Sequence, residues 1–257
     1  MILLTGATGN LGSALLRRLV ASGERVRCLV RDPRGLGPER VRVQIALGDL
    51  AEPASFRNAL RGVDTVVHLA AAIRDQPRAS IEELNAVATL RLLRAAERTG
   101  VERFVFASAI GASLHAPARF FRAKALAEDA VAGSPLRTVI LAPSIVYSPR
   151  DPWIRLLEHM SLLPAMPISG SGRARYQPIW ADDAAAAVAA ALSRNGQERA
   201  RYDLAGPETL SYDDMARETL RALRRRRRLL HLPLPFVRAG LAALQTVTGQ
   251  AAFATWE

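Results

Sequence analysis

Three glycines, each separated from the next by two residues, follow the first apolar run of the chain and constrain its fold more than any other feature. Ile2–Leu4 leads into Thr5-Gly6-Ala7-Thr8-Gly9-Asn10-Leu11-Gly12, and leucines then recur at helical spacing as far as Gly23. This order predicts a strand, a tight turn and a helix. In such a turn the first glycine permits the reversal, the second lets the backbone approach a pyrophosphate, and the third lets the helix pack closely on the sheet. Free N–H groups at the helix start then face the phosphates. We therefore expect a dinucleotide site at Gly6, Thr8, Gly9, Asn10, Leu11 and Gly12; the alternative is a tight turn that binds no ligand.

Short β-branched runs alternate with amphipathic helical stretches over the first 140 or so residues. This alternation is typical of βαβ units, so we expect an α/β fold, a Rossmann-type doubly wound parallel sheet in residues 1–145. The longest predicted helix covers about Ile81–Thr99 and ends at Gly100, a natural C-cap. The expected strands are Ile2–Leu4, Arg25–Val30, Val41–Leu47, Thr65–Leu69, Phe104–Ala107 and Thr138–Leu141.

Prolines interrupt the chain after Pro143, and the pattern becomes less regular. We expect a helix after Asp182-Asp183, a short strand near Tyr202–Leu204 and a helix that begins at Ser211, a plausible N-cap. No flexible linker separates the two halves. Residues 146–257 are therefore predicted to form a small C-terminal α/β cap that carries the substrate region and is interleaved with the cofactor domain.

The composition fits a globular protein: 49% of the 257 residues are hydrophobic and 23% are charged. Cys28 is the single cysteine, which excludes an intrachain disulfide and fits a reducing compartment. The N-terminus lacks a basic region before its short apolar run, so no secretory signal is expected, and no apolar run reaches the length of a membrane span. The predicted location is the cytoplasm, and no metal site is expected.

Several further motifs follow the predicted strands. They are Gly48-Asp49-Leu50, the segment Val66-Val67-His68-Leu69-Ala70-Ala71, Asn85, Phe106-Ala107-Ser108-Ala109, and Leu141-Ala142-Pro143-Ser144. Together with the glycine turn, this set resembles the extended and atypical short-chain dehydrogenases/reductases, which include NAD-dependent epimerases and dehydratases. The resemblance covers nearly the whole chain. It implies that Asp49, Leu50, Leu69, Ala70, Ala71 and Pro143 also contact a nicotinamide dinucleotide.

The end of the second predicted strand bears on the choice of dinucleotide. An acidic residue there would bind the adenosine ribose and reject a 2′-phosphate. This strand ends in Arg31 and then Asp32, and the Arg31 guanidinium can bind a 2′-phosphate with Arg34 nearby. We expect NADP in preference to NAD, although a small shift would bring Asp32 to the ribose.

The proton donor of the family is absent from its usual position. Related reductases use a tyrosine four residues before a lysine, together with a serine. Ser108 and Lys124 match as catalytic residues, and Lys124 also as a ligand of the nicotinamide ribose, but Phe120 stands at the tyrosine position. Glu128 lies one turn after Lys124 and is a candidate partner for it. Alternative donors are His115 and Tyr147, and Ser108 has the alternative role of a strand-end hydroxyl that bonds to backbone.

Because Phe120 replaces the tyrosine of the family, two functions remain open. The first is an NADP(H)-dependent oxidoreductase acting on a small carbonyl or sugar-type substrate. The second is a dinucleotide-binding redox sensor or accessory subunit without turnover, as the resemblance to NmrA-like regulators and to the NAD(P)-binding accessory subunit of respiratory complex I implies. The lone lysine of the chain, Lys124, falls at the position where the family requires an ammonium.

The net charge of +11 includes five consecutive arginines, Arg224 to Arg228. The basic residues are otherwise scattered and form no stripe with aromatics, so a nucleic-acid partner is not expected. One interpretation of the run is a solvated helix end that leads into a short strand. The other is a peripheral contact with an anionic membrane or a protein complex, because the apolar segment 236–244 follows. The chain ends at Trp256-Glu257, earlier than the family leads us to expect.

Overall fold

The chain forms two compact units. The computed structural model describes residues 1–77, 79–149, 151–193, 199–235 and 237. The first unit contains Met1–Val146 and Ile179–Leu204, and the second contains Tyr147–Pro178 and the chain from Ala205 onward. The expected assignment of residues 1–145 to the cofactor and 146–257 to the substrate stays a prediction. The predicted apolar segment 236–244 lies outside the described residues except for Val237.

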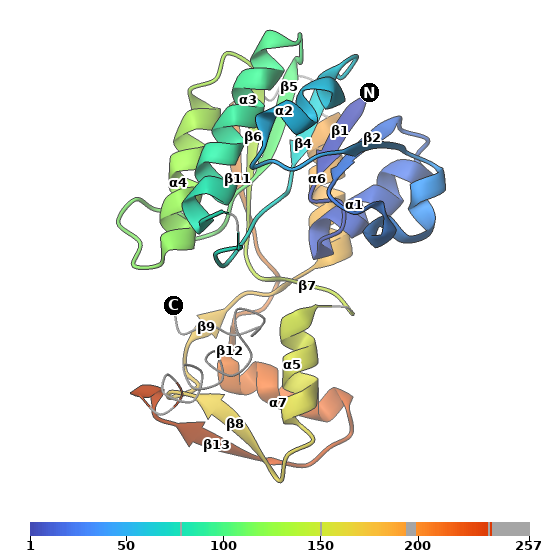
Figure 1. Ribbon diagram of the computed structural model, residues 1–257. Coiled ribbons are helices and arrows are strands. Elements are labelled where there is room, and N and C mark those ends of the chain that lie inside the picture. The colour runs from blue at the N-terminus through green and yellow to red at the C-terminus, as the bar shows by residue number, and fades with distance from the viewer. Residues whose placement is uncertain (78, 150, 194–198, 236, 238–257) are drawn as a thin grey trace. The chain divides into compact units, whose positions relative to one another are not determined.

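A seven-stranded sheet forms the centre of the first unit, and its strands run parallel (Figure 1). Their order is β11-β6-β5-β4-β1-β2-β3. From β1 the chain first adds β2 and β3 on one side and then β4, β5, β6 and β11 on the other, so the strand order reverses at β1. Such a reversal opens a crevice at the carboxyl ends of the strands. The strands are β1 (Ile2–Thr5), β2 (Val26–Val30), β3 (Gln44–Leu47), β4 (Thr65–His68), β5 (Arg103–Ala107), β6 (Arg137–Pro143) and β11 (Ala200–Leu204).

Helices cover both faces of this sheet, and each face has its own apolar core. On one face α1 (Asn10–Ala21) packs beside α6 (Ala181–Ser193). On the other lie α2 (Pro53–Phe56), the short helix η2 (Arg57–Leu60), α3 (Ala88–Arg98) and α4 (Arg119–Ala132). Alternate residues of β1 face opposite cores, with Leu4 in the first and Leu3 in the second, as the two-residue period of a strand requires. The predicted doubly wound parallel fold is confirmed.

Two predicted elements differ from those observed. The predicted strand Val41–Leu47 begins only at Gln44, because the preceding segment η1, Pro33–Val41, consists of two short helices. Asp32 caps the first, and the chain kinks between them at Gly37, which has a φ of +64°. The predicted helix Ile81–Thr99 contains the π-helical turn η3 over Glu83–Val87, followed by α3. A π turn is wider than an α turn, and such turns are frequent at functional sites.

The second unit has a small core between two helices and a pair of strands. Helix α5 (Pro152–Met160) and helix α7 (Tyr212–Ala222) pack against β8 (Ala165–Ser169), which pairs in parallel with β13 (Arg228–Leu232). The predicted N-cap at Ser211 is confirmed, since Ser211 and Asp214 form a capping box. The short strands β9 (Arg175–Tyr176) and β12 (Leu210–Ser211) form an antiparallel pair; β7 (Val146–Tyr147) and β10 (Ile179–Trp180) lie where the chain passes between the units.

Among the helices of the described ranges, none combines the length and the apolar character needed to cross a bilayer.

Candidate dinucleotide site

A cavity of about 600 Å³ lies at the carboxyl ends of four adjacent strands, β4, β1, β2 and β3. This volume is within the usual range for small-molecule sites. The turn after each of the four strands contributes to the wall. Of the predicted cofactor residues, those in the wall are Gly6, Thr8, Gly9, Arg31, Asp49, Leu50, Leu69, Ala70 and Ala71.

The glycine turn has the close approaches that its spacing predicts. Gly6 has a φ of +71°, and a Cβ there would lie 2.6 Å from the Ala70 nitrogen. A Cβ on Gly12 would lie 2.0 Å from the Gly6 carbonyl oxygen, so α1 packs on its own leading turn only because residue 12 is glycine. Gly9 is different, since a Cβ there would meet only the Gly6 oxygen, at 3.4 Å. The missing side chain at Gly9 therefore leaves room toward the cavity, as a backbone approach to a pyrophosphate requires.

The first turn of α1 contains the remaining predicted residues of this loop. Asn10 donates from Nδ2 to the Val146 carbonyl at 3.3 Å, and Leu11 is buried in the core. Both residues therefore hold the helix start in place, and neither is part of the cavity wall.

A chain of buried hydrogen bonds lies beneath the cavity wall. His68 is fully buried; its Nδ1 lies 2.7 Å from Thr5 Oγ1 and its Nε2 lies 2.9 Å from Thr89 Oγ1. Thr89 donates its hydroxyl proton to the Asn85 carbonyl at 2.6 Å, so the Thr89 oxygen accepts from His68. Nδ1 then accepts from Thr5, whose oxygen accepts from the Ala70 N–H at 3.4 Å. Burial, and then the positive charge of Lys124, lower the pKa of His68 to about 3, so the ring is neutral.

The Asn85 side chain fixes the wall from the helix side. Its Oδ1 accepts from the Ala72 N–H at 3.1 Å, and its Nδ2 donates to the Ala72 carbonyl at 2.7 Å and to the Ile81 carbonyl at 2.9 Å. Asn85 lies in the π turn η3. The amide therefore pairs with both backbone groups of Ala72, a wall residue.

Two charged residues at the end of β2 lie in the wall, and they differ in their pairing. The Asp32 carboxylate receives three hydrogen bonds from the Arg34 side chain and one from its backbone N–H, and these hold the pKa of Asp32 below its usual range. Arg34 is thereby paired with Asp32. Arg31 is exposed, and within the described residues its side chain has no hydrogen bond or ion pair.

Asp49 follows β3 and stands in a turn that it helps to hold. Its N–H donates to Ser55 Oγ at 2.8 Å, and its Oδ1 accepts from the Ala51 N–H at 3.0 Å. Leu50 packs partly against the core beneath this turn. The turn therefore presents Asp49 and Leu50 to the cavity in a fixed conformation.

Lys124 lies outside the cavity wall and is only 1% exposed. Its Nζ donates to the Ala107 carbonyl at 2.7 Å, and lies 4.7 Å from the centre of the Phe106 ring and 5.9 Å from that of Phe120. Burial lowers the pKa of Lys124 from 10.5 to about 7. The expected ion pair with Glu128 is wrong, since Glu128 pairs with Arg201 at 3.0 Å among the described residues. The negative charge of Glu128 nevertheless raises the pKa of Lys124 and so opposes the effect of burial.

Ser108 and Pro143 lie at the ends of β5 and β6, on the far side of β4 from the glycine turn. The Ser108 N–H donates to the Leu141 carbonyl at 2.7 Å, and the Pro143 carbonyl accepts from the Ile110 N–H at 3.0 Å. The Ser108 hydroxyl is buried and has no hydrogen-bond partner in the described part of the chain. This finding does not match the alternative of a hydroxyl that bonds to backbone. Most buried hydroxyls have a partner, so the Ser108 hydroxyl is an exception.

The two alternative proton donors, His115 and Tyr147, do not lie directly at the ends of β5 and β6. His115 is exposed in the turn before α4, where its N–H donates to Ser113 Oγ. Tyr147 begins the second unit.

Sequence reasoning missed one part of the wall, the segment after β4. Ala72, Ile73, Arg74 and Gln76 line the cavity together with Leu84. Arg119 at the start of α4 holds this segment through ion pairs with Asp75 at 2.9 Å and Glu82 at 2.6 Å. No periodicity marks these residues; the only signal is their position directly after a strand whose end faces the crevice.

The comparisons with known proteins agree with this geometry. Residues 6–195 match the family model described as NAD(P)H-binding. The chain belongs to this NAD(P)H-binding family. It carries a nicotinamide dinucleotide-binding domain, and the resemblance to short-chain dehydrogenases/reductases is confirmed.

Curated relatives include a mitochondrial NADH dehydrogenase subunit and an azoreductase. The chain is 29% identical over 91% of its length to NADH dehydrogenase [ubiquinone] 1 alpha subcomplex subunit 9 of Arabidopsis thaliana, and it spans 60% of that protein. It is 30% identical over 84% of its length to NAD(P)H azoreductase of Xenophilus azovorans, of which it spans 71%. Among solved structures, UDP-glucose 4-epimerase of Thermus thermophilus in complex with NAD superposes with a TM-score of 0.77 at 22% identity, over 90% of this chain and 86% of the other. That structure supports the fold alone.

Proposed function

We propose that the protein is an NADP(H)-dependent oxidoreductase that acts on a small carbonyl or sugar-type substrate. The observation that carries this proposal is the buried Ser108 hydroxyl, which has no hydrogen-bond partner among the described residues. It stands one residue after Ala107, whose carbonyl binds Lys124. Ser108 and the Lys124 ammonium are thus both placed at the end of β5, which neighbours β4, one of the four strands whose following turns form the cavity wall.

The residues that would hold the dinucleotide follow from the wall. The turn Gly6–Gly9 and the start of α1 offer backbone N–H groups to the pyrophosphate. Asp49 and Leu50 would hold the adenosine, and Leu69 to Ala71 would lie along the cofactor. The bound dinucleotide supplies hydride transfer at its nicotinamide ring. Pro143, Ser108 and Lys124 would lie toward the reacting end.

The preference for NADP over NAD rests on the contrast between Arg31 and Asp32. Asp32 is occupied by Arg34, so it is a poor acceptor for ribose hydroxyls. Arg31 keeps its five donors and a full positive charge at the cavity. A 2′-phosphate is the group on the two cofactors that such a guanidinium distinguishes.

Titration of cofactor fluorescence tests this preference. Arg31→Ala should weaken NADPH binding about 10- to 100-fold, the usual effect of losing a charge-assisted hydrogen bond to phosphate, and leave NADH binding nearly unchanged. Arg42→Ala removes another exposed arginine outside the wall and serves as the control. Equal NADPH affinity in Arg31→Ala and the unaltered protein would refute the preference.

The proton for the substrate oxygen has to come from a group other than Phe120. A lysine whose pKa lies near 7 releases a proton at neutral pH, which an ordinary lysine does not. We infer that Ser108 binds the substrate oxygen and that Lys124 supplies the proton. In a panel of carbonyl substrates, Ser108→Ala should lower kcat/KM, and Lys124→Met should lower kcat strongly. The enzyme proposal fails if no carbonyl compound oxidises NADPH.

The second candidate is a cofactor-binding subunit without turnover. Phe120 at the donor position favours it, and so does the similarity to the respiratory subunit of Arabidopsis thaliana. Phe120→Tyr discriminates between the two candidates when it is assayed beside Phe121→Tyr, a hydroxyl added at the adjacent position. A large change in turnover for Phe120→Tyr alone supports an active site. Cofactor binding without turnover in all three proteins supports the accessory role.

A further inference from the structure

The arginine run of the second unit lines a groove. Helix α7 ends at Ala222, and the groove of about 430 Å³ that follows is lined by six arginines and one leucine. They are Arg217, Leu220, Arg221, Arg225, Arg226, Arg227 and Arg228. Six like charges around one concave surface repel one another unless counter-charges are present.

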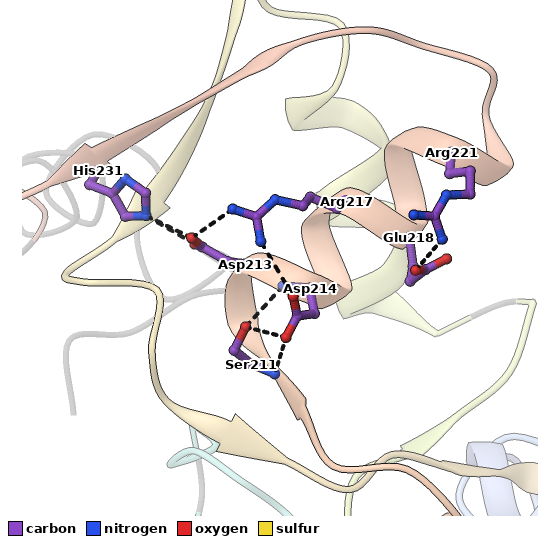
Figure 2. A network of polar contacts seen from close by, with 7 residues as sticks. All are labelled: Ser211, Asp213, Asp214, Arg217, Glu218, Arg221 and His231. Carbon is purple, nitrogen blue, oxygen red and sulfur yellow. Dashed lines mark hydrogen bonds and ion pairs between the residues drawn. The ribbon is translucent and has the colours of Figure 1, made fainter.

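Helix α7 supplies counter-charges for only two of the six arginines. Figure 2 shows Arg217 beside Asp213 and Asp214, and Arg221 beside Glu218. Arg225 donates to Ser161 Oγ at 2.5 Å, a neutral partner. Within the described residues, no carboxylate pairs with Arg225, Arg226, Arg227 or Arg228. Four positive charges of the groove therefore have no paired carboxylate in the part of the chain that the structure describes.

The backbone at the end of α7 turns the run outward. The Arg224 N–H donates to the Arg221 carbonyl and the Arg225 N–H to the Leu220 carbonyl, the hydrogen bonds of a Schellman cap. Arg224 occupies the left-handed position of this cap with a φ of +53°, where glycine is usual. The reversal brings Arg225 back against α5 and leads the next three arginines into β13.

Exposed leucines flank the charged residues. Leu162 and Leu163 follow Ser161, the partner of Arg225, and are 60% and 47% exposed. In β13, Leu229 packs toward the core opposite Met166, so Leu230 lies on the other face of the strand pair, 52% exposed. Large apolar side chains are thus exposed in the turn after α5, next to the partner of Arg225, and on β13, two residues after Arg228.

We propose that this arginine–leucine face, Arg225 to Arg228 with Leu162, Leu163 and Leu230, docks on the surface of an anionic lipid bilayer. The guanidiniums match phosphodiester headgroups, and the leucines enter the interface between headgroups and acyl chains. The exposed apolar residues of the face are aliphatic, whereas sites for single-stranded nucleic acid stack bases on aromatic rings. This docking is independent of the cofactor and of turnover.

Flotation of the full chain with lipid vesicles tests the proposal. We expect binding to vesicles of phosphatidylcholine mixed with phosphatidylglycerol, weak binding to pure phosphatidylcholine, and release at high salt. The triple variant Arg226→Gln, Arg227→Gln and Arg228→Gln should bind about 100-fold more weakly. Leu162→Ser with Leu163→Ser should lower binding about tenfold.

A matched control separates this face from the overall charge. Arg18→Gln, Arg42→Gln and Arg57→Gln remove three exposed arginines of the first unit and should leave vesicle binding almost unchanged. Urea unfolding reports whether each variant is folded. Equal losses in the two triple variants would overturn the proposal, as would a lack of binding to anionic vesicles. Displacement by inorganic phosphate at constant ionic strength would identify a free-phosphate site instead, and tight binding of an oligonucleotide that the first triple variant abolishes would identify a nucleic-acid site instead.

Discussion

Gly12→Ala should lower the stability of the chain, whereas Gly9→Ala should leave stability nearly unchanged and weaken cofactor binding. In Gly12→Ala the new Cβ would lie 2.0 Å from the Gly6 oxygen, 2.7 Å from the Gly6 carbonyl carbon and 2.9 Å from Ala7 Cα. All three are backbone atoms, so no side-chain rotation relieves the overlap. Overpacking costs about 1–3 kcal/mol, and the upper end applies because the turn itself must move. A loss of about 3 kcal/mol lowers the Tm by roughly 6–12 °C in a chain of this size.

Gly9→Ala is the matched variant. Residue 9 has φ −80° and ψ 175°, a conformation that alanine adopts readily, and its Cβ would meet only the Gly6 oxygen at an ordinary distance. Stability should therefore change by less than about 0.5 kcal/mol. The methyl group would nevertheless occupy the space toward the cavity, so NADPH affinity should fall at least about tenfold.

Thermal unfolding with and without NADPH measures both effects in one experiment. The unaltered protein should gain stability from the ligand, Gly9→Ala should start at the same Tm and gain little, and Gly12→Ala should start lower. Gly12→Ala with an unchanged Tm would refute the packing argument. Gly9→Ala with the full ligand-induced shift would refute the assignment of the turn to the pyrophosphate.

Three further predictions concern charge and capping. The pKa of Lys124 is about 7 in the folded chain and 10.5 when the side chain is exposed. Between these pH values the unfolded chain binds one more proton than the folded chain. The contribution of Lys124 to the free energy of unfolding therefore rises with pH, by up to about 1.4 kcal/mol per pH unit. Thermal unfolding from pH 7 to pH 9 should show this rise, since above pH 9 the buried Cys28 thiol, whose pKa burial raises from 9.0 to about 12, lowers stability as the pH rises. Lys124→Met should remove the rise, and a rise that persists would contradict the buried ammonium. Arg224→Gly should stabilise the second unit by about 0.5–1 kcal/mol by relieving the left-handed backbone, as measured by urea unfolding, and a loss of stability would contradict the cap. Ser211→Ala should cost about 1 kcal/mol in the same assay through loss of the capping box, with Ser171→Ala in a loop as the control.

The parts of the fold that could be predicted are those in which a local pattern and a long-range requirement coincide. The glycine spacing predicted the turn because a side chain at residue 6 would overlap the backbone of Ala70, and a side chain at residue 12 would overlap the backbone of Gly6. The strand positions followed from β-branched runs, since a sheet covered on both faces needs apolar residues throughout. The Ser211 cap followed from the capping preferences of single residues.

The rest depends on contacts that no local pattern encodes. Lys124 donates to Ala107 and not to Glu128, because Arg201, 73 residues after Glu128 in the chain, pairs with the glutamate. The π turn at Glu83–Val87 has an ordinary helical sequence, and the wall segment around Arg74 is fixed by Arg119 on a different helix. The arginine run was visible, but its groove arises only where the cap of α7 reverses the chain.

The π turn η3 also sets the rotational phase of the helix that contains Asn85. Each residue of an α-helix advances by about 100°, so a turn with one additional residue shifts every side chain before it relative to those after it. Removing one residue from Glu83–Val87 would restore a regular helix and would rotate Asn85 away from Ala72 if Thr89 stayed on His68. Alignment of this helix between relatives therefore requires a single-residue gap wherever the wide turn is absent. Insertion or deletion of one residue after Asn85 would therefore change the positions of the cavity-wall residues without changing their amino-acid types.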